Sequence, residues 1–344
     1  MDKIAILTGD PNGIGAEITL KALNILNLPK DKIVLISNKS ILDYYASCHP
    51  EFISGSVDLI KKNKILKQVQ NDRMNLSCNH KLINKYDIIE IPYDKSDIKV
   101  GQVTAQAGEF SFQSLKKICE LKPKAIVTAP VAKNALHLAG YNFNGQTEVL
   151  QKYLSHDGQL AEMLFVAGNF RVLLLTRHCA LKNINLTKEI VIRKIENLVK
   201  TFKTVFKIEN PKFALCGFNP HAGEDGILGT EEIEILIPAV EYLRDEGIDI
   251  TYPKPSDTLF INAGRHYVNG EKDDYDCYIA CYHDQGLIPI KTVAGEKTVN
   301  TTIGLDIIRT SPMHGTAFDI AGKGIANPNS MVEAIKLAME LSEY

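Results

Sequence analysis

The sequence lacks the features that mark several classes of protein. Its first residues, MDKIAILTGDPNGIG, have neither the long apolar core nor the small-residue cleavage site of a signal peptide. No apolar run reaches the roughly 18 residues that a membrane-spanning helix needs. Lys and Arg number 39 against 41 Asp and Glu, a net charge of −2, so the basic excess of a nucleic-acid-binding protein is missing. We therefore expect a cytoplasmic protein with no membrane and no nucleic-acid partner.

The sequence also lacks the common cysteine and glycine motifs of metal, redox and nucleotide sites. The seven cysteines are odd in number, and no two are spaced as CxxC, which is typical of reduced, mostly buried thiols in the cytosol. The glycine-rich loop Gly9–Gly15 follows one predicted strand and opens a predicted helix. This loop is neither GxGxxG nor a P-loop, because the GK[ST] sequence is missing. The sequence thus excludes a standard Rossmann or kinase site at the usual place.

The pattern that is present indicates an α/β fold. With 344 residues the chain has the length of about two domains. Short apolar runs alternate with amphipathic stretches of ten or more residues, which predicts mostly parallel sheets. The expected strands are 3–7, 32–37, 86–91, 125–128, 162–166, 171–176, 212–217 and 276–282, and the expected helices 17–26, 104–121, 187–206, 231–245 and 330–341. Residues 50–100, with four lysines in Lys61–Lys67, are expected to form an exposed excursion with a solvated surface.

Three apolar strand runs each lead into a histidine: His178, His221 and His283. Loops at the carboxyl ends of parallel strands converge, so these three side chains can meet although they are far apart in sequence. Imidazole is the commonest metal ligand, and three protein ligands leave a position open for substrate. Any one of them alone is more simply a loop histidine, but the shared context favours a metal site. Asp284 and Gln285 follow His283 and are candidates to orient it.

A second group of residues suits an anionic ligand. Lys291 follows the apolar stretch Leu287–Ile290, and Asn300 and Arg309 lie in a segment with few other charges. A cation in apolar surroundings needs an anion, which a substrate phosphate or carboxylate would supply. An internal salt bridge, for example to Asp306, is an equally simple alternative. Gln146 and Thr147 add amide and hydroxyl groups at a predicted helix start.

The segment HGTAFDIAGKGIANP, residues 314–328, has three glycines, and its backbone can approach a ligand closely. Asp319 there can accept hydrogen bonds from ribose hydroxyls. A plain surface loop is the alternative on spacing alone.

Taken together, these segments resemble a known family. The stretches are LTGDPNGIGAEI, NGQTE, TRHCAL, GFNPHAGEDGILGTEEI, YHDQGLIPIK and VNTTIGLDIIRTSPMHGTAFDIAGKG. They resemble the 4-hydroxythreonine-4-phosphate dehydrogenases of vitamin B6 synthesis from residue 4 to beyond residue 330. The loop from His314 also looks like the adenosine-binding loop of isocitrate and isopropylmalate dehydrogenases, whose fold this family shares.

The resemblance implies two α/β/α domains of the isocitrate/isopropylmalate dehydrogenase-like type with a cleft between them. The first domain would comprise 1–127 with 293–344, and the second 128–292. It implies a homodimer with the active site at the interface and histidines drawn from both subunits. One divalent metal, Zn²⁺, Co²⁺ or Mg²⁺, would be held by His178, His221 and His283.

The resemblance also implies the ligand contacts. The substrate would be bound by Gln146, Thr147, Lys291, Asn300 and Arg309. NAD or NADP would be bound by His314, Gly315, Thr316, Asp319 and Asn327. Gln146 departs from the family, which usually has histidine there. A glutamine can donate a hydrogen bond to a phosphate oxygen, but it carries no charge and shuttles no proton.

The expected reaction is the NAD(P)-dependent oxidation of 4-phosphooxy-L-threonine to 2-amino-3-oxo-4-phosphooxybutanoate. This β-keto acid then decarboxylates to 3-amino-2-oxopropyl phosphate. A dehydrogenase of 4-phosphoerythronate, of D-threonate 4-phosphate or of the unphosphorylated isopropylmalate is an alternative within the same class. A metal-dependent hydrolase and a non-catalytic metal-binding scaffold are alternatives from other classes.

Overall fold

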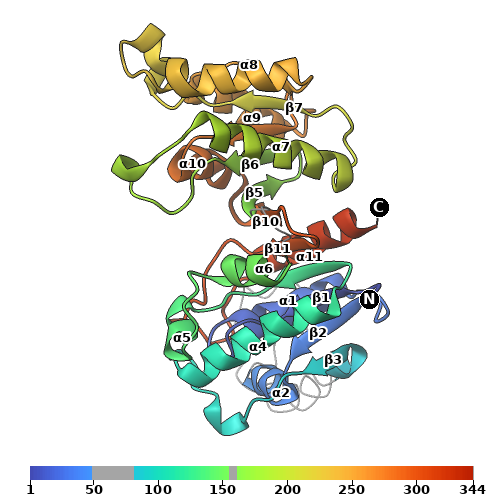
Figure 1. Ribbon diagram of the computed structural model, residues 1–344. Coiled ribbons are helices and arrows are strands. Elements are labelled where there is room, and N and C mark those ends of the chain that lie inside the picture. Colours follow the sequence, from blue (N-terminus) through green and yellow to red (C-terminus); the bar gives the residue numbers. More distant parts are fainter. Residues whose placement is uncertain (49–80, 155–160, 344) are drawn as a thin grey trace, which may run out of the picture. The chain divides into compact units, whose positions relative to one another are not determined.

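The computed structural model describes residues 1–48, 81–154 and 161–343, and the chain divides into two compact units (Figure 1). Unit 1 comprises Met1–His156 and Arg309–Glu340, and unit 2 comprises Asp157–Ile308 and Leu341–Tyr344. Unit 1 is thus built from both ends of the chain. These limits differ from the domain boundaries that the resemblance implies, which stay a prediction.

Unit 1 contains a sheet with the strand order β3-β2-β1-β4-β11. β1 pairs in parallel with β2 and with β4, and β2 pairs in parallel with β3. The strands are β1 (Ile4–Leu7), β2 (Ile33–Ser37), β3 (Asp87–Glu90), β4 (Ala125–Thr128) and β11 (Ile308–Ser311). The helices are α1 (Gly15–Leu26), α2 (Lys39–Cys48), α4 (Ala105–Leu121), α5 (Lys133–Leu138), α6 (Gln146–Leu154) and α11 (Asn329–Ser342).

Unit 2 contains strands in the order β10-β5-β6-β9-β7-β8. β9 pairs in parallel with β6 and β7, and β7 with β8, whereas β5 is antiparallel to both β6 and β10. The strands are β5 (Glu162–Ala167), β6 (Phe170–Leu174), β7 (Lys212–Leu215), β8 (Asp249–Ile250), β9 (Cys277–Ala280) and β10 (Val299–Ile303). The helices are α7 (Lys188–Thr204), α8 (Ile237–Asp245), α9 (Ser256–Asn269) and α10 (His283–Ala294).

Helices pack against the strands in each unit. In unit 1, α4 contacts β1 and β2 and also packs on α5 and α6. In unit 2, α9 and α10 pack on each other and on β6, while α7 and α8 form a second pair. All four residues of β1 and of β4 are buried, as strands covered on both faces require. The α/β class expected from the sequence is therefore confirmed.

Local signals explain where the longest helices begin. Thr187 precedes α7, and its hydroxyl accepts a hydrogen bond from the backbone N–H of Ile190 at 3.3 Å. Thr104 caps α4 in the same way, with the N–H of Ala107 at 3.2 Å. Such caps satisfy backbone donors that the first helical turn leaves without an intrahelical acceptor. Of the expected excursion 50–100, residues up to 80 lie outside the described residues, and the described part contains β3.

No helix within the described residues is long and apolar enough to cross a membrane.

An ion pair lies in the core of unit 2. The ammonium of Lys194 on α7 contacts the carboxylate of Glu162 on β5, and the side chains are 10% and 1% exposed. Burial lowers the pKa of Lys194, and the carboxylate partly opposes this effect. Removing one partner of a buried pair leaves the other charge without compensation, which is more damaging than replacing both.

We expect Lys194→Met to lower the free energy of unfolding by about 3–5 kcal/mol, because Glu162 would stay buried without its cation. Urea unfolding followed by circular dichroism measures this loss. The matched control is Lys200→Met at an exposed position of the same helix, for which we expect a change within about 0.5 kcal/mol. The double variant Lys194→Met/Glu162→Met should recover most of the loss. Equal free energies of unfolding for Lys194→Met and Lys200→Met would contradict the prediction.

Candidate functional site

Two of the three predicted metal-binding histidines lie side by side in unit 2. His178 follows β6, and His283 is the first residue of α10, just after β9. Because β6 and β9 are parallel neighbours, their carboxyl ends lie at the same edge of the sheet. The two imidazole rings are 5.2 Å apart between centroids and tilted by 50°. The structure thus brings these two histidines together through the strand-end geometry expected from the sequence.

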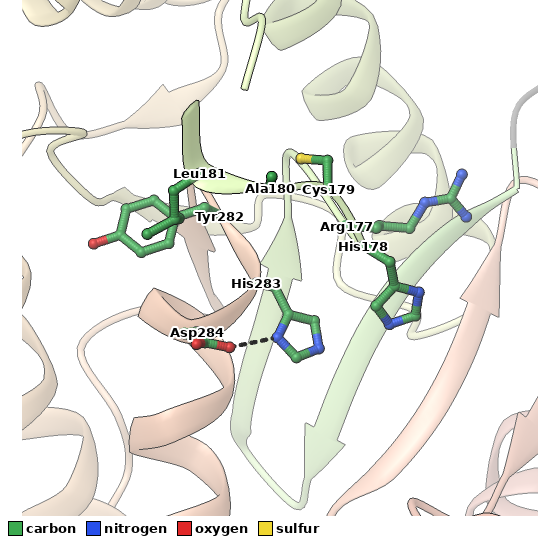
Figure 2. Close-up of a pocket in the computed structure, with 8 residues that line it drawn as sticks. All are labelled: Arg177, His178, Cys179, Ala180, Leu181, Tyr282, His283 and Asp284. Carbon is green, nitrogen blue, oxygen red and sulfur yellow. Dashed lines mark hydrogen bonds and ion pairs between the residues drawn. The ribbon is translucent and has the colours of Figure 1, made fainter. Parts of the chain in front are cut away.

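A pocket of about 270 Å³ surrounds this pair (Figure 2). It is lined by residues of the two strand-end segments, Arg177–Leu181 and Tyr282–Asp284. Both imidazoles lie on the same side of the drawn segments, whereas the Arg177 guanidinium points away from them (Figure 2). Arg177 donates to the carbonyl of Ala161 at 3.2 Å. The pocket therefore brings the two histidines together with Asp284 and the neighbouring residues of both segments.

Asp284 and Gln285 play different parts. The Oδ1 atom of Asp284 lies 2.7 Å from Nδ1 of His283, which leaves Nε2 as the nitrogen available to a ligand. A carboxylate in this position fixes the tautomer and the ring orientation of a metal-binding imidazole. Gln285 contacts the backbone instead: its Oε1 accepts from the N–H of Cys281 at 2.7 Å, and its Nε2 donates to the carbonyl of Gly217 at 2.6 Å. Gln285 therefore ties the ends of β9 and β7 together.

The third histidine, His221, lies in a left-handed turn. It belongs to the segment Pro220–Gly226, which follows β7. From His221 to Asp225 every residue has a positive φ, between 43° and 82°, although Gly223 is the only glycine among them. Left-handed backbone costs about 1–2 kcal/mol for each residue with a Cβ atom. Such strain persists only where the surroundings over-determine it, which is typical of functional sites.

Buried polar contacts hold this turn. Asn219 donates from its backbone N–H to Oε1 of Glu232 at 2.7 Å, and its side-chain amide donates to Glu231 and Glu232 at 2.6 and 2.9 Å. Glu232 is 2% exposed and begins a single π-helical turn, Glu232–Leu236, ahead of α8. A Cβ atom at Gly229 would lie 2.4 Å from Nδ2 of Asn219, so a side chain there would break the contacts. These contacts were not predicted from the sequence, in which their signal is the acidic pair Glu231 and Glu232 of the stretch GTEEI.

His221 itself is mostly exposed, and its Nδ1 lies 2.5 Å from Oε1 of Glu224. This hydrogen bond, with the carboxylate's charge, raises the pKa of His221. Within the described parts of this single chain, no three His, Cys, Asp or Glu side chains gather closely enough to hold a metal. His221 therefore does not join His178 and His283 here, and the three-histidine set stays a prediction.

Unit 1 holds three of the expected substrate-binding residues. Arg309 on β11 is 3% exposed, and its Nε and Nη2 atoms donate to the hydroxyl of Thr128 at 3.1 and 2.8 Å. Burial lowers its pKa to about 10, while Glu148 acts in the opposite direction, so the guanidinium stays charged at neutral pH. Gln146, the first residue of α6, donates from Nε2 to the carbonyl of Ala129 at 3.0 Å, and Thr147 follows it. Arg309 and Gln146 thus contact consecutive residues at the end of β4.

Unit 2 holds the other two. Asn300 lies half-buried on β10, opposite Phe165 of β5. Lys291 lies on α10, and its side chain is exposed. The premise that Lys291 sits in apolar surroundings is therefore wrong, because the helix turns it to solvent. The same premise holds for Arg309, which is buried.

The expected cofactor loop lies in unit 1 between β11 and α11. Gly315, Asp319 and Asn327 are exposed, and His314 and Thr316 are half-buried. The Nε2 atom of His314 is enclosed and has no hydrogen-bond partner within the described residues. An enclosed polar atom of this kind fits a loop that completes its contacts with a ligand.

The chain matches a known protein family and curated proteins over most of its length. The family model of the pyridoxal phosphate biosynthetic protein PdxA matches residues 31–338. A 4-hydroxythreonine-4-phosphate dehydrogenase of Sulfurihydrogenibium sp. (strain YO3AOP1) is 39% identical, with 99% of this chain and 98% of the relative covered. A D-threonate 4-phosphate dehydrogenase of Salmonella typhimurium is 36% identical, with 98% of both chains covered.

Solved structures agree with these matches. The crystal structure of a 4-hydroxythreonine-4-phosphate dehydrogenase from Klebsiella pneumoniae superimposes with a TM-score of 0.80 at 31% identity. The match covers 99% of this chain and 100% of that chain. The similarity therefore extends over both units.

Asp284→Ala should weaken divalent-metal binding by about 10–100-fold, because His283 would lose the carboxylate that orients its ring. Titration with Co²⁺, followed by its visible absorption, measures the affinity without any turnover. Asp274→Ala, which removes another unit 2 carboxylate from outside the pocket lining, is the control and should bind Co²⁺ as the unsubstituted protein does. Unchanged affinity in Asp284→Ala would exclude an orienting role for Asp284.

Proposed function

We propose an activity for this chain from the premise that it belongs to the family of the pyridoxal phosphate biosynthetic protein PdxA. It is an NAD(P)-dependent 4-hydroxythreonine-4-phosphate dehydrogenase. It oxidises the C3 hydroxyl of 4-phosphooxy-L-threonine to a ketone, which gives 2-amino-3-oxo-4-phosphooxybutanoate. This β-keto acid loses CO₂ because the adjacent carbonyl accepts the electron pair of the breaking bond, and 3-amino-2-oxopropyl phosphate results. The reaction serves vitamin B6 synthesis.

The adjacent imidazoles of His178 and His283 are the observation that carries the catalytic part of this proposal. Their nitrogens suit Zn²⁺ or Co²⁺ and, less well, Mg²⁺, and His221 supplies the third ligand. A bound divalent metal lowers the pKa of a coordinated hydroxyl and stabilises negative charge on that oxygen. Asp284 holds His283 with Nε2 directed toward a ligand, so the donor set and its supporting carboxylate fit the metal.

The remaining residues bind and orient the substrate. Arg309 keeps its charge in a buried position and can donate to a phosphate or carboxylate oxygen. Lys291, Asn300, Gln146 and Thr147 add donors, and the phosphate supplies binding energy remote from the reacting carbon. Anchoring at one end of the substrate holds the C3 carbon in position for hydride transfer. A bound nicotinamide dinucleotide would supply the acceptor for this hydride.

The dinucleotide is assigned to the loop that contains His314, Gly315, Thr316, Asp319 and Asn327. Asp319 is exposed and free to accept hydrogen bonds from ribose hydroxyls. Its negative charge opposes a 2′-phosphate, which favours NAD over NADP.

The protein acts as a homodimer in which His221 completes the site of the partner subunit. Apolar side chains flank the turn that carries His221: Ile227 is 80% exposed, Leu228 44% and Ile233 48%. Exposed apolar residues grouped in this way are typical of a protein interface. A contact over these residues would cover them and bring in His221 at the same time.

A cytoplasmic location fits the thiols. Cys119, Cys179, Cys216 and Cys277 are free, and so is Cys281.

Oxidation of D-threonate 4-phosphate is the second candidate, carried by the 36% identity to the Salmonella enzyme of that name. That substrate has a hydroxyl group where 4-phosphooxy-L-threonine has its amino group. A metal-dependent hydrolase is not supported, since the relatives described above are named dehydrogenases.

A substrate comparison tests the proposal. Purified protein with NAD⁺ and Zn²⁺, Co²⁺ or Mg²⁺ is given 4-phosphooxy-L-threonine or D-threonate 4-phosphate, and the absorbance of the reduced cofactor is followed. We expect the higher kcat/KM with 4-phosphooxy-L-threonine and loss of turnover after chelation. Turnover of D-threonate 4-phosphate alone would establish the second candidate. No reduced cofactor with either compound and any metal would refute both.

Gln146→His should keep or raise kcat/KM. Histidine also donates a hydrogen bond in place of the Gln146 amide, which now contacts the carbonyl of Ala129. The comparison is made with the same assay and with Gln146→Leu, which removes the donor and should lower kcat/KM by about tenfold. A collapse of activity in Gln146→His would show that the amide has a role that imidazole does not fill.

A further inference from the structure

The first glycine-rich loop of the chain has no part in the activity described so far. Residues 9–14 lie between β1 and α1 in unit 1, and side-chain hydrogen bonds fix the backbone of this loop. The single hydroxyl proton of Tyr45 is shared between the carbonyls of Pro11 and Gly13, whose oxygens lie 3.1 and 2.8 Å from the hydroxyl oxygen. The side chain of Asn12 donates to the carbonyl of Gln102 at 3.0 Å and accepts from the N–H of Lys99 at 2.7 Å. The loop is therefore a rigid support with its backbone fixed on two sides.

The cofactor loop rests on this support. The backbone N–H of Ile14 donates to the carbonyl of Thr316 at 3.0 Å. A Cβ atom at Gly13 would lie 2.9 Å from that same carbonyl oxygen and 3.0 Å from Cβ of Thr316. Glycine at position 13 therefore serves the close approach of another backbone. This explains the glycine at position 13 of a loop that matches no phosphate-binding motif.

A buried pair on α1 holds the other end of the cofactor loop. Glu17 is fully buried, and its Oε1 accepts both the backbone N–H of Ala326 and the ammonium of Lys21, each at 2.9 Å. The same ammonium donates to the carbonyls of Gly324 and Ala326, at 2.9 and 2.7 Å. Three charge-assisted hydrogen bonds thus join these two side chains, one helical turn apart, to a three-residue stretch of loop backbone, and a fourth joins the two side chains to each other.

We propose that Glu17 and Lys21 are positioning residues for the dinucleotide, which hold the backbone of the cofactor loop in its binding conformation. This inference rests on the proposed function, because that function assigns the loop to NAD. The contacts fit a positioning role, since these hydrogen bonds reach backbone atoms of the loop. The side chains of Asp319 and Asn327 stay exposed for a ligand.

The energetic consequence concerns the free protein. A loop with three glycines samples many conformations unless it is held. The apparent dissociation constant of a ligand rises as the fraction of protein in the competent conformation falls. Loss of the Lys21 ammonium removes the bonds to Gly324 and Ala326 and therefore lowers that fraction. The effect falls on the cofactor and not on the phosphorylated substrate.

The test measures cofactor and substrate separately in the full chain with its divalent metal. Lys21→Met keeps most of the apolar stem and removes the charge. We expect it to raise the dissociation constant for NADH, titrated by NADH fluorescence, and the KM for NAD⁺ by about tenfold, the factor that follows if the competent fraction falls to a tenth. The KM for the phosphorylated substrate and kcat at saturating NAD⁺ should change less than about twofold on the same argument. Lys21→Arg should restore part of the affinity.

Two further variants sharpen the result. Lys116→Met removes an exposed lysine of α4 and should bind NADH as the unsubstituted protein does. Gly13→Ala disturbs the loop at Thr316 and should weaken NADH binding without any change in charge. Equal NADH binding by Lys21→Met and Lys116→Met would overturn the inference, and so would an equal rise of both KM values in Lys21→Met. If the unsubstituted protein itself bound no NADH and reduced no NAD⁺, the proposed function would fall, and the inference with it.

Discussion

The parallel pairing of β6 with β9 is the constraint on which the candidate metal site depends. Leu174 lies opposite Ala280 in this register, so the two strands end at one edge of the sheet. Each chain segment then needs only a few residues to reach its histidine. A slip of one residue would move every side chain of a packed strand to the opposite face of the sheet. The register is therefore strongly specified. The 5.2 Å separation of the two imidazole rings is thus a consequence of core packing.

This dependence explains what sequence alone reveals. Apolar runs such as residues 125–128 and 212–217 predict strands, because only buried strands tolerate them, and the structure confirms these strands within two residues. The carboxyl-end rule then places His178 and His283 near each other without any knowledge of side-chain positions. The rule needs only strand identity and direction. The rule can place residues that directly follow neighbouring parallel strands, but it does not predict the conformation of a loop.

Features that depend on tertiary contacts were not predictable in this way. Neither α9 nor α10 was predicted from the sequence. In α10, Gly286 and Pro289 interrupt the apolar pattern. A Cβ atom at Gly286 would lie 2.8 Å from side-chain atoms of Val172 and Leu174, so this glycine serves helix-to-strand packing. The left-handed turn of His221 depends on Asn219 and the buried Glu232, which a local pattern cannot connect to backbone strain. Lys291 was misjudged for a related reason, since its helix exposes it.

Two buried cations, Lys194 and Arg309, differ in the groups that they contact. Arg309 lies in a segment with few other charges, whereas Lys194 lies in the charged helix α7. Lys194 contacts the carboxylate of Glu162, and that pair is part of the core of unit 2. Arg309 donates to the hydroxyl of Thr128, and burial lowers its pKa while the charge of Glu148 acts in the opposite direction. A guanidinium held at such a cost in hydration gains more from an added phosphate than a solvated one does. Under the proposed function, the buried arginine therefore contributes more than the exposed Lys291 to the preference for a phosphorylated substrate.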